Sequence, residues 1–347
     1  MASHRRAAPR WAVAALVTGL ILVVAVTTTA VGGFLLLDRW QRAVPQEELL
    51  DPADQPPTPE RPASPRRRPA PAPEGAGDPV TGPLNYLVVG TDQRPDNPGQ
   101  AAFADAIVVV HIPAGLREAY LVSIPRDLRV DIPGHGTDKI NAAYRVGGGG
   151  AEGVSLLADT LYDLTGVTFD GAAILDFAGF EAVVDALGGV EMCLTRSVRS
   201  IHTGHVFPTG CQRLRGAEAL DLARQRYDLP AGDFDRGRHH QQLIQAMVAQ
   251  ARSEGLVTNP IQLDRTIRAI GSAVTIDTGG VALPELVYAL RQLRPDRMTG
   301  ITVPSYSQRI DGISYVLAEP AATTLYQALR DAQLHRWVED HPEWHND

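Results

Sequence analysis

The stretch LNYLVVGTDQRPDNPGQAAFADAIVVVHIPAGLREAYLVSI, residues 84–124, decides the fold. It contains three short runs rich in valine, leucine and isoleucine, at Leu84–Val89, Ala106–Ile112 and Ala119–Ile124. The turn Pro113–Arg117 separates the last two. Short apolar runs bounded by turn residues are typical of buried strands. We therefore predict three strands in this stretch.

Strand and helix patterns alternate in the rest of the chain. Further strands are predicted at Ala172–Leu175, Val190–Leu194 and Ile301–Pro304. Apolar residues at helical spacing predict helices at Val154–Leu164, Phe177–Leu187, Gln241–Ala251, Leu263–Ala273, Leu283–Leu293 and Pro320–Leu334. Such alternation predicts a layered α/β/α domain with a central mixed sheet and helices on both of its faces.

The N-terminal part carries a long uncharged stretch. Trp11–Leu37 has no charged side chain, and at about 1.5 Å per residue it is long enough for one transmembrane helix. Arginines in residues 1–10 predict that this end is cytoplasmic, so the rest of this single-pass protein of the cell membrane lies outside. A cleaved signal peptide ending near Thr27–Ala30 is the alternative.

Residues 38–83 differ in composition from both neighbours. They include PPTPERP and PRRRPAPAP and have almost no apolar periodicity. This composition is typical of an extended linker, which would let a domain stand off the membrane. We expect the domain itself over residues 84–335 and a C-terminal tail over residues 336–347.

The charge and the cysteine content of the chain limit the classes of function and site that are possible. The formal net charge of −8 argues against a nucleic-acid binder, because such proteins are normally basic. Cys193 and Cys211 are the only cysteines, and both fall on the predicted outer side. An even pair in an oxidising compartment favours a disulfide, and a metal site that combines the thiols with His202 and His205 is the alternative.

The sequence ARQRYDLPAGDFDRGRHHQQ, residues 223–242, concentrates cations. Arg224 and Arg226 point the same way only on an extended segment, whereas Arg236 and His240 share one face only on a helix. Guanidinium groups bind phosphate through two hydrogen bonds, so this set suits a ligand with several phosphate oxygens. A solvated arginine surface is the alternative, and Arg238 is expected to be solvated in either case.

Polar residues also follow the ends of the predicted strands. Asp92 in GTDQR comes after the first strand, Asp105 precedes the second, and SIPRD places Arg126 and Asp127 after the third. Ligand sites usually form at such strand ends, and two carboxylates with phosphate oxygens suit Mg²⁺. Taken alone, each aspartate could be a turn former or a helix cap, and Lys139 in DKIN could be a surface residue.

These motifs together resemble the LytR-CpsA-Psr family. The resemblance rests on GTDQR, ADAIVVVHI, LVSIPRDLRVDIPG, DKINAAY, VDALGGV, the L-x-G-x-E-A-L pattern, ARQRY and DFDRGRHHQQ, and it covers roughly residues 83–251. The cysteine pair and the anchor-plus-linker layout are similar to those of actinobacterial members. The resemblance implies an extracytoplasmic phosphotransferase that moves a glycopolymer from a polyprenyl-pyrophosphate carrier onto peptidoglycan and releases polyprenyl phosphate.

The resemblance also implies roles for single residues. Asp92 and Asp105 match the metal-associated aspartates, and the expected cofactor is Mg²⁺. The expected pyrophosphate ligands are Arg94, Arg126, Lys139, Arg224, Arg226, Arg236 and His240. The catalytic set is Asp92, Arg126 and Asp127, and either aspartate could take the proton of the acceptor hydroxyl.

Two positions depart from the family pattern. Phe103 stands where many members have an arginine, which removes one phosphate contact that Arg94 could offset. His240 stands where glutamine is usual, and a histidine that titrates near neutrality could make binding weakly pH-dependent.

The carrier lipid and the type of reaction leave alternatives open. The polyprenyl chain needs an apolar groove, which helices at Val154–Leu164 and Phe177–Leu187 could line, although both could be ordinary core. The chain lacks the G-x-x-x-x-G-K-[ST] nucleotide loop, as expected for an enzyme that uses a preactivated lipid. Competing functions are a hydrolytic polyprenyl-pyrophosphatase and a non-catalytic, membrane-anchored regulator that binds polyprenyl phosphates.

Overall fold

The computed structural model describes residues 44–50, 80–93, 102–225, 232–256 and 259–346. A seven-stranded sheet in the order β11-β6-β1-β2-β3-β12-β15 lies at its centre. Its strands are β1 (Leu84–Thr91), β2 (Ala104–Ile112), β3 (Ala119–Ser123), β6 (Gly171–Leu175), β11 (Val274–Asp277), β12 (Met298–Thr302) and β15 (His345–Asn346). β6 runs parallel to β1 and β12 parallel to β3, and the other neighbours are antiparallel. The sheet is therefore mixed, as predicted.

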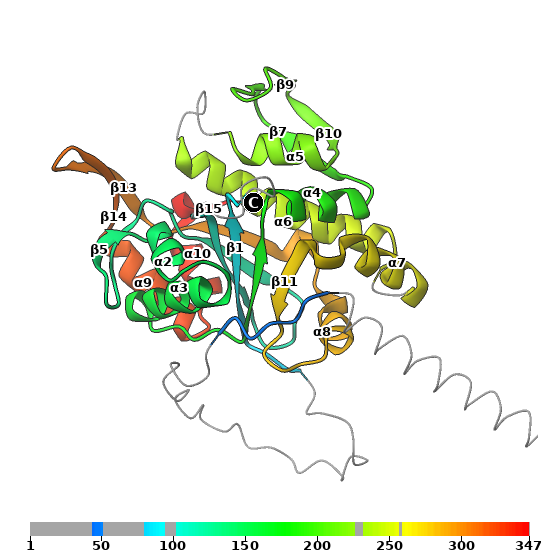
Figure 1. The fold of residues 1–347 in the computed structure, drawn as a ribbon, viewed down its shortest axis with the longest axis horizontal. Coiled ribbons are helices and arrows are strands. Elements are labelled where there is room, and N and C mark those ends of the chain that lie inside the picture. The colour runs from blue at the N-terminus through cyan, green and yellow to red at the C-terminus, as the bar shows by residue number, and fades with distance from the viewer. Residues whose placement is uncertain (1–43, 51–79, 94–101, 226–231, 257–258, 347) are drawn as a thin grey trace, which may run out of the picture.

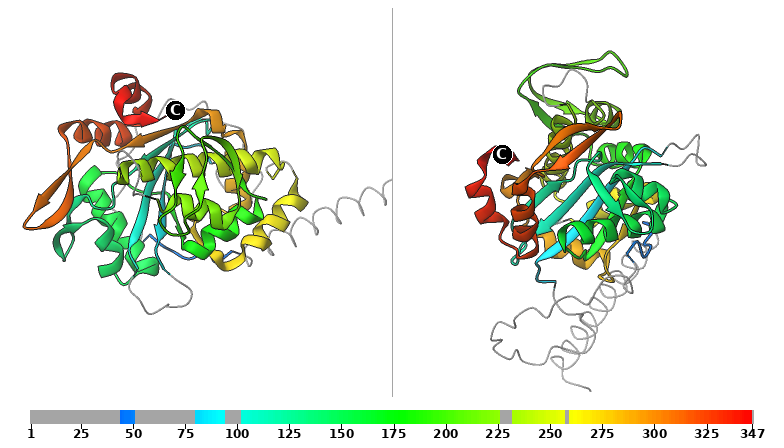
Figure 2. Two further views of the ribbon diagram at one scale, coloured as in Figure 1. Left: turned by 90° about the horizontal axis from the view of Figure 1, so that it is seen from above. Right: turned by 90° about the vertical axis from the view of Figure 1, so that its left-hand side faces the viewer.

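Helices cover both faces of this sheet (Figures 1 and 2). One face carries α2 (Asn141–Val146), α3 (Gly150–Thr165) and α9 (Pro320–Arg330), and the other carries α4 (Phe177–Ala186), α6 (Asp233–Ser253) and α8 (Leu283–Ala289). Side chains of β1 alternate between the two layers, because Leu87 packs in the core that includes Leu157 of α3, while Val88 packs with Ile244 of α6. The predicted α/β/α layering is confirmed.

A small lobe packs on the outer side of α6 and forms its own core. It consists of β7 (Val190–Leu194), β8 (Val198–Arg199), β9 (Val206–Phe207), β10 (Gly210–Leu214) and α5 (Gly216–Ala223). Met192, Phe207 and Leu222 are almost fully buried in it. β7 and β10 pair so that Cys193 lies opposite Cys211.

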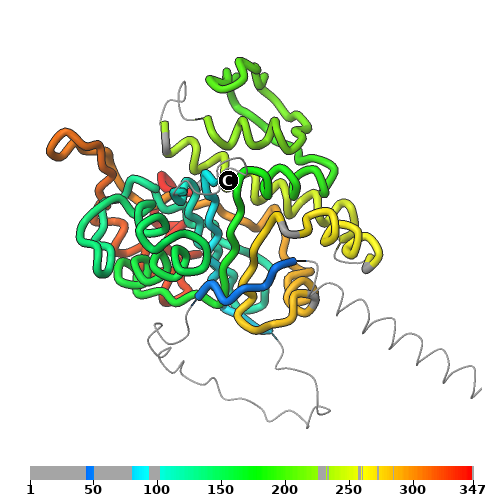
Figure 3. The backbone as a smooth tube through the Cα atoms, in the orientation of Figure 1, coloured from blue at the N-terminus to red at the C-terminus, as the bar shows by residue number. Residues whose placement is uncertain are grey.

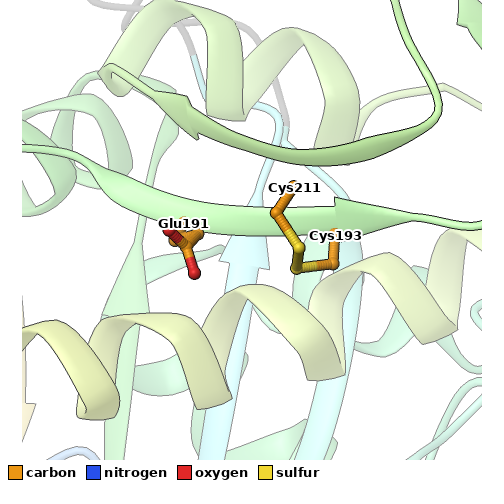
Figure 4. A group of neighbouring side chains, drawn as sticks. All are labelled: Glu191, Cys193 and Cys211. Atoms are coloured by element: carbon orange, nitrogen blue, oxygen red, sulfur yellow. A yellow bond between two sulfur atoms is a disulfide. The ribbon is translucent and has the colours of Figure 1, made fainter.

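The two cysteines form the predicted disulfide (Figure 4). Together with Glu191 they make up the one group of three metal-type side chains found among the described residues. Because both sulfur atoms are bonded to each other, they offer no thiolate to a metal. The alternative of a thiol–histidine metal site is therefore not supported.

The sequence prediction missed several strands, including those of two hairpins outside the central sheet. One pairs β4 (Arg129–Ile132) with β5 (Gly136–Lys139), and the other pairs β13 (Ser305–Ile310) with β14 (Ile313–Ala318). The second projects from the body of the domain (Figure 1). Most side chains of β13 are exposed, so no buried face imposed an alternating apolar pattern on its sequence.

The packed domain extends beyond the predicted boundaries at both ends. Residues 44–50 fall in the predicted linker, yet they lie against β11 (Figure 3) and bury Val44 and Leu49. At the other end, β15 pairs with β12 as an edge strand, so residues 345–346 of the predicted tail belong to the sheet. The expected transmembrane helix at residues 11–37 lies outside the described residues, among which no helix has the length and apolar character needed to cross a bilayer.

Candidate active site

A cavity of about 580 Å³ lies between one face of the sheet and the helices α4, α5 and α6. Two chemically different groups of side chains line it. The charged or titratable ones include Asp92, Asp105, Arg126, Arg224, Arg236 and His240. The apolar ones include Phe177, Phe180, Leu220, Leu243, Ile244 and Met247. The structure thus brings six of the predicted site residues to one cavity.

Asp92 is held at the cavity by the backbone of the neighbouring strand end. The β1–β2 register shifts between Gly90 and Thr91, and such irregularities re-aim the side chains that follow. The backbone N–H of Phe103 donates to Asp92 Oδ1 at 2.7 Å, and the N–H of Asp92 donates to the carbonyl of Phe103 at 3.3 Å. These two bonds fix the carboxylate just beyond the end of β1.

Asp105 and Arg126 form an ion pair across the ends of β2 and β3. Arg126 Nη1 lies 2.5 Å from Asp105 Oδ1, and the two side chains are 15% and 30% exposed. The Arg126 backbone is also fixed, since its carbonyl accepts a hydrogen bond from the N–H of Asn141 at 3.1 Å. We call Asp92, Asp105 and Arg126 the sheet wall of the cavity.

The opposite side, which we call the helix wall, carries Arg224, Arg236 and His240. Arg224 caps the C-terminus of α5, and its guanidinium carbon lies 4.6 Å from the centre of the Phe177 ring. The predicted extended segment at Arg224 is therefore wrong, because this residue ends a helix. The predicted helical face of Arg236 and His240 is confirmed, since both belong to α6 and both line the cavity.

Glutamines of the same motif hold the helix wall in place. Gln225 is fully buried, accepts from the N–H of Ile201 and donates to Ser200 Oγ and Asp221 Oδ1. Gln241 is 1% exposed, and its Nε2 donates to the carbonyls of Leu121 and Ile301 and to a serine hydroxyl on β3. These amides position the neighbouring arginines and tie α6 to the sheet.

The surroundings of His240 favour its neutral form. Its Nε2 donates to the carbonyl of Ala223 at 3.0 Å, which links α6 to α5. Burial, and then the nearby Arg236 guanidinium, lower the pKa of His240 to about 3. This lowered pKa argues against the expected titration near neutrality. Burial also lowers the pKa of the adjacent His239.

Other predicted site residues are placed elsewhere. Lys139 Nζ pairs with Asp127 Oδ1 at 2.9 Å and lies 5.9 Å from the centre of the Tyr315 ring, and neither member of this pair lines the cavity. Arg94 and Arg226 lie outside the described residues.

The apolar groove was predicted correctly on one side only. Phe177 and Phe180 of α4 line the cavity, as expected. Helix α3 does not, because it packs on the opposite face of the sheet and buries Leu157 and Leu161 in the core there. α5 and α6 take its place.

Several lining residues were missed by sequence reasoning. Asp176 is the N-cap of α4 and accepts from the N–H of Gly179 at 2.6 Å, and an aspartate directly before an apolar helical pattern could have revealed it. Ile201 and His202 reach the cavity from the loop between β8 and β9. No local pattern marks them, because their position depends on contacts with α5.

Phe103, where the family resemblance expects an arginine, has an arginine beside it. The guanidinium carbon of Arg145, which comes from α2, lies 5.0 Å from the centre of the Phe103 ring. Such cation–π contacts hold a guanidinium in place without neutralising its charge. A cation therefore lies next to the ring of Phe103, although it comes from another element.

Known proteins are similar to this chain in sequence and in fold. The model of the LytR_cpsA_psr family matches residues 62–331. Cell wall biosynthesis protein LcpA of Corynebacterium glutamicum is 33% identical over 276 residues, which cover 68% of this chain and 52% of that protein. Polyisoprenyl-teichoic acid–peptidoglycan teichoic acid transferase TagU of Enterococcus faecalis is 31% identical over 178 residues, 51% of this chain and 56% of that protein. The chain thus spans about half the length of these curated relatives.

Solved structures agree on the fold. A structure of TagT bound to LI-WTA has a TM-score of 0.55 at 24% identity and covers 72% of this chain and 89% of that one. Protein gbs0355 from Streptococcus agalactiae has a TM-score of 0.63 at 19% identity, with 73% and 88% covered. At these identities the likeness shows the fold alone.

Proposed function

The chain belongs to the LytR-CpsA-Psr family, and we propose that it is a phosphotransferase that moves a glycopolymer from a polyprenyl-pyrophosphate carrier onto peptidoglycan. The observation that carries this proposal is the cavity, which joins charged side chains to an apolar wall. A polyprenyl-pyrophosphate has the same two parts, an anionic head and a hydrocarbon tail. The name of the TagU relative describes a transfer of this kind for that protein.

The lining residues divide the binding of the carrier between them. Arg126, Arg224 and Arg236 bind the pyrophosphate oxygens, since guanidinium groups bind phosphate through two hydrogen bonds. Phe177 and Phe180 contact the first isoprene units. The neutral His240 adds no charge, so its role is to hold α6 against α5.

The proposed reaction is an in-line displacement at phosphorus. A hydroxyl oxygen of peptidoglycan forms a bond to the phosphorus that carries the glycan, and the bond from that phosphorus to the bridging oxygen breaks. Polyprenyl phosphate leaves with that oxygen, and the hydroxyl proton passes to a carboxylate. We assign this proton to Asp92, because Asp127 is paired with Lys139 away from the cavity. The arginines stabilise the charge that develops on the phosphoryl oxygens.

Asp92 and Asp105 fit a magnesium ion. Mg²⁺ is usually held in proteins by one or two carboxylates together with phosphate oxygens and water, and these two carboxylates line one cavity. Each uses one oxygen for a protein contact, with the N–H of Phe103 or with Arg126. Bound there, the ion would neutralise charge on the pyrophosphate.

The proposal places the domain outside the cytoplasmic membrane. Trp11–Leu37 is the proposed anchor, and the disulfide suits an oxidising compartment. The partners are then the cell membrane, a lipid-linked glycopolymer and peptidoglycan.

A transfer assay with the full-length protein tests the reaction. The protein is incubated with a lipid-linked glycan, Mg²⁺ and peptidoglycan, and the glycan is traced by a radioactive label. Label on peptidoglycan supports the phosphotransferase. Release of free phosphorylated glycan alone would identify a hydrolase, and binding of the lipid without turnover would favour a regulator. MsrR of Staphylococcus aureus, 36% identical over 168 residues, is named a regulatory protein.

A further inference from the structure

Residues 44–50 form a strap that is built into the domain. Val44 is 3% exposed and packs with Ile267 of α7 (Pro260–Ile270) and Leu283 at the start of α8. The N–H of Ile276 in β11 donates to the carbonyl of Pro45 at 3.2 Å. The strap therefore begins in the gap between α7 and α8 and continues along the edge of the sheet.

The other end of the strap is fixed more firmly. The N–H groups of Leu49 and Leu50 donate to the same oxygen, Asp277 Oδ2, at 3.0 and 3.2 Å. Asp277 is 9% exposed, and both leucines are buried in the main core. A buried carboxylate that accepts two backbone N–H groups is costly to leave without them. The strap is therefore part of the fold.

This attachment changes the distance between the membrane and the domain. Residues 38–43 alone separate Leu37, the last residue of the proposed anchor, from Val44. Even fully extended, that step spans about 24 Å, whereas the step from Leu37 to Val80 would allow about 140 Å. The proline-rich residues 51–79 connect two points of the same domain, Leu50 and Val80, so their length adds nothing to its reach.

We propose that the strap docks the domain with its α7–α8 side against the bilayer. This inference rests on the proposed membrane anchor but not on the proposed reaction. Ile261 of α7 and Tyr288 of α8 are 62% and 63% exposed, the two highest values among the large apolar side chains of the described residues. Arg291 lies on the Tyr288 ring at 3.7 Å. Tyrosine and arginine are common at the level of lipid head groups.

The same orientation gives the carrier lipid a short route to the cavity. Helix α4 packs against α7 and carries Phe177 and Phe180 into the cavity wall. A bilayer at the α7–α8 side therefore lies next to the apolar wall. The β13–β14 hairpin lies at the opposite end of the domain (Figures 1 and 2) and would point away from the lipid.

Energy transfer from the full-length protein to head-group-labelled lipid vesicles tests the docking. A donor dye is placed on Ala269→Cys, an exposed position of α7, or on Ser307→Cys in the β13–β14 hairpin. Co-flotation with the vesicles is measured first and tests the anchor. We expect flotation, and a transfer efficiency at Ala269→Cys at least about twice that at Ser307→Cys.

Two insertions then separate the strap from the proline-rich segment. A Gly/Ser insertion of about 20 residues has an average length of about 25 Å and is placed between Arg42 and Ala43 or between Ala70 and Pro71. We expect the first to lower the transfer efficiency at Ala269→Cys at least about two-fold and the second to leave it unchanged. Leu49→Asp should act like the first, and Gln46→Asp, on an exposed neighbour, should not.

Each outcome decides the proposal. Protein that does not float with vesicles would overturn the anchor and the docking together. Protein that floats but responds equally to both insertions, or only to the second, would overturn the docking alone. Equal transfer from the two dye positions would overturn the proposed orientation. The glycan-transfer assay is scored separately, because label on peptidoglycan reports the reaction whichever side of the domain faces the bilayer.

Discussion

The two walls of the cavity carry arginines in different surroundings. In the sheet wall, Arg126 is paired with Asp105 at 2.5 Å. In the helix wall, Arg224 lies on the ring of Phe177, and within the described part of the chain no carboxylate pairs with it. The first charge is largely compensated before any ligand arrives, whereas the second remains available.

Because of this difference, we expect the two arginines to contribute differently to the stability of the fold and to ligand binding. A compensated, mostly buried ion pair fixes the ends of β2 and β3, and loss of one partner leaves the other charge unpaired. An uncompensated guanidinium on an aromatic ring contributes little to folding but attracts an anion strongly. Substitutions in the sheet wall should therefore affect stability and activity together, and Arg224 substitutions should affect activity alone.

The largest effect is expected for Arg126→Ala. Removal of one preorganised donor to a developing oxyanion costs about 10²- to 10³-fold in rate, and the unpaired Asp105 adds repulsion of the pyrophosphate, so we expect transfer to fall about 10³-fold or more. The melting temperature should fall by several degrees. Transfer assays and thermal unfolding measure the two effects.

Arg129→Ala is the control for this substitution. Arg129 is exposed on β4, with its guanidinium carbon 5.8 Å from the centre of the Tyr315 ring, and it is not a lining residue of the cavity. It should keep near-normal transfer and stability. An Arg126→Ala protein that loses activity without any loss of stability would show that the two walls do not differ as argued.

The second effect is a loss of activity at unchanged stability in Arg224→Ala. We expect transfer to fall about 10²-fold, by the same loss of one donor to the phosphoryl oxygens, with a melting temperature close to that of the parent. Arg238→Ala is the matched control. Arg238 belongs to the same cation-rich stretch, residues 223–242, but its guanidinium pairs with Asp235 at 2.7 Å. Similar activities of the two variants would contradict the assignment of Arg224 to the site.

The two walls also differed in how well the sequence predicted them. The sheet wall follows from local patterns, because Asp92, Asp105 and Arg126 flank short apolar runs that form β1, β2 and β3. Strand ends that share one sheet edge bring such residues together without further information. The predicted strands begin or end within two residues of the observed ones at these three positions.

The helix wall depends on contacts that no local pattern reveals. The two-residue spacing of Arg224 and Arg226 suggested a strand, but Arg224 caps the short helix α5, whose core partners come from β7 and β9. Similarly, α3 and α4 both carry amphipathic patterns, and tertiary packing alone decides that α4 faces the cavity while α3 lies behind the sheet. The strap was missed for the same reason, since only Asp277 and the α7–α8 gap make Val44, Leu49 and Leu50 core residues.

A third prediction concerns pH and the helix wall. Burial lowers the pKa of His240 to about 3, whereas an unfolded histidine has its ordinary value near 6.5. Between these values the unfolded chain binds one more proton than the folded protein, so the free energy of unfolding rises with pH in this range. The stability that neutral His240 contributes is therefore lost as the pH falls below about 6.5. The expected slope from this residue is about 1.4 kcal/mol per pH unit.

His240→Gln isolates this contribution. Glutamine does not titrate, so the difference in unfolding free energy between the parent and the variant should change with pH between about 4.5 and 6.5 and be constant above 7. Denaturant unfolding at a series of pH values measures it. Transfer by the parent should show no step near pH 6.5 that the variant lacks. A pH-independent difference in stability would mean that His240 is accessible to protons in the folded state.

The smallest effect is expected for Asp127→Asn, and it decides which carboxylate takes the acceptor proton. Asp127 pairs with Lys139 through side chains that are about one-quarter exposed, and pairs of this kind contribute less than about 1 kcal/mol. Because neither residue lines the cavity, we expect transfer to change less than about two-fold, whereas Asp92→Asn should lower it by about 10² or more. The two variants are compared at saturating Mg²⁺, so that a weakened metal site in Asp92→Asn is not mistaken for loss of the base. A large loss in Asp127→Asn with normal activity in Asp92→Asn would transfer the role of base to the β4–β5 side of the domain and require the pair with Lys139 to open during the reaction.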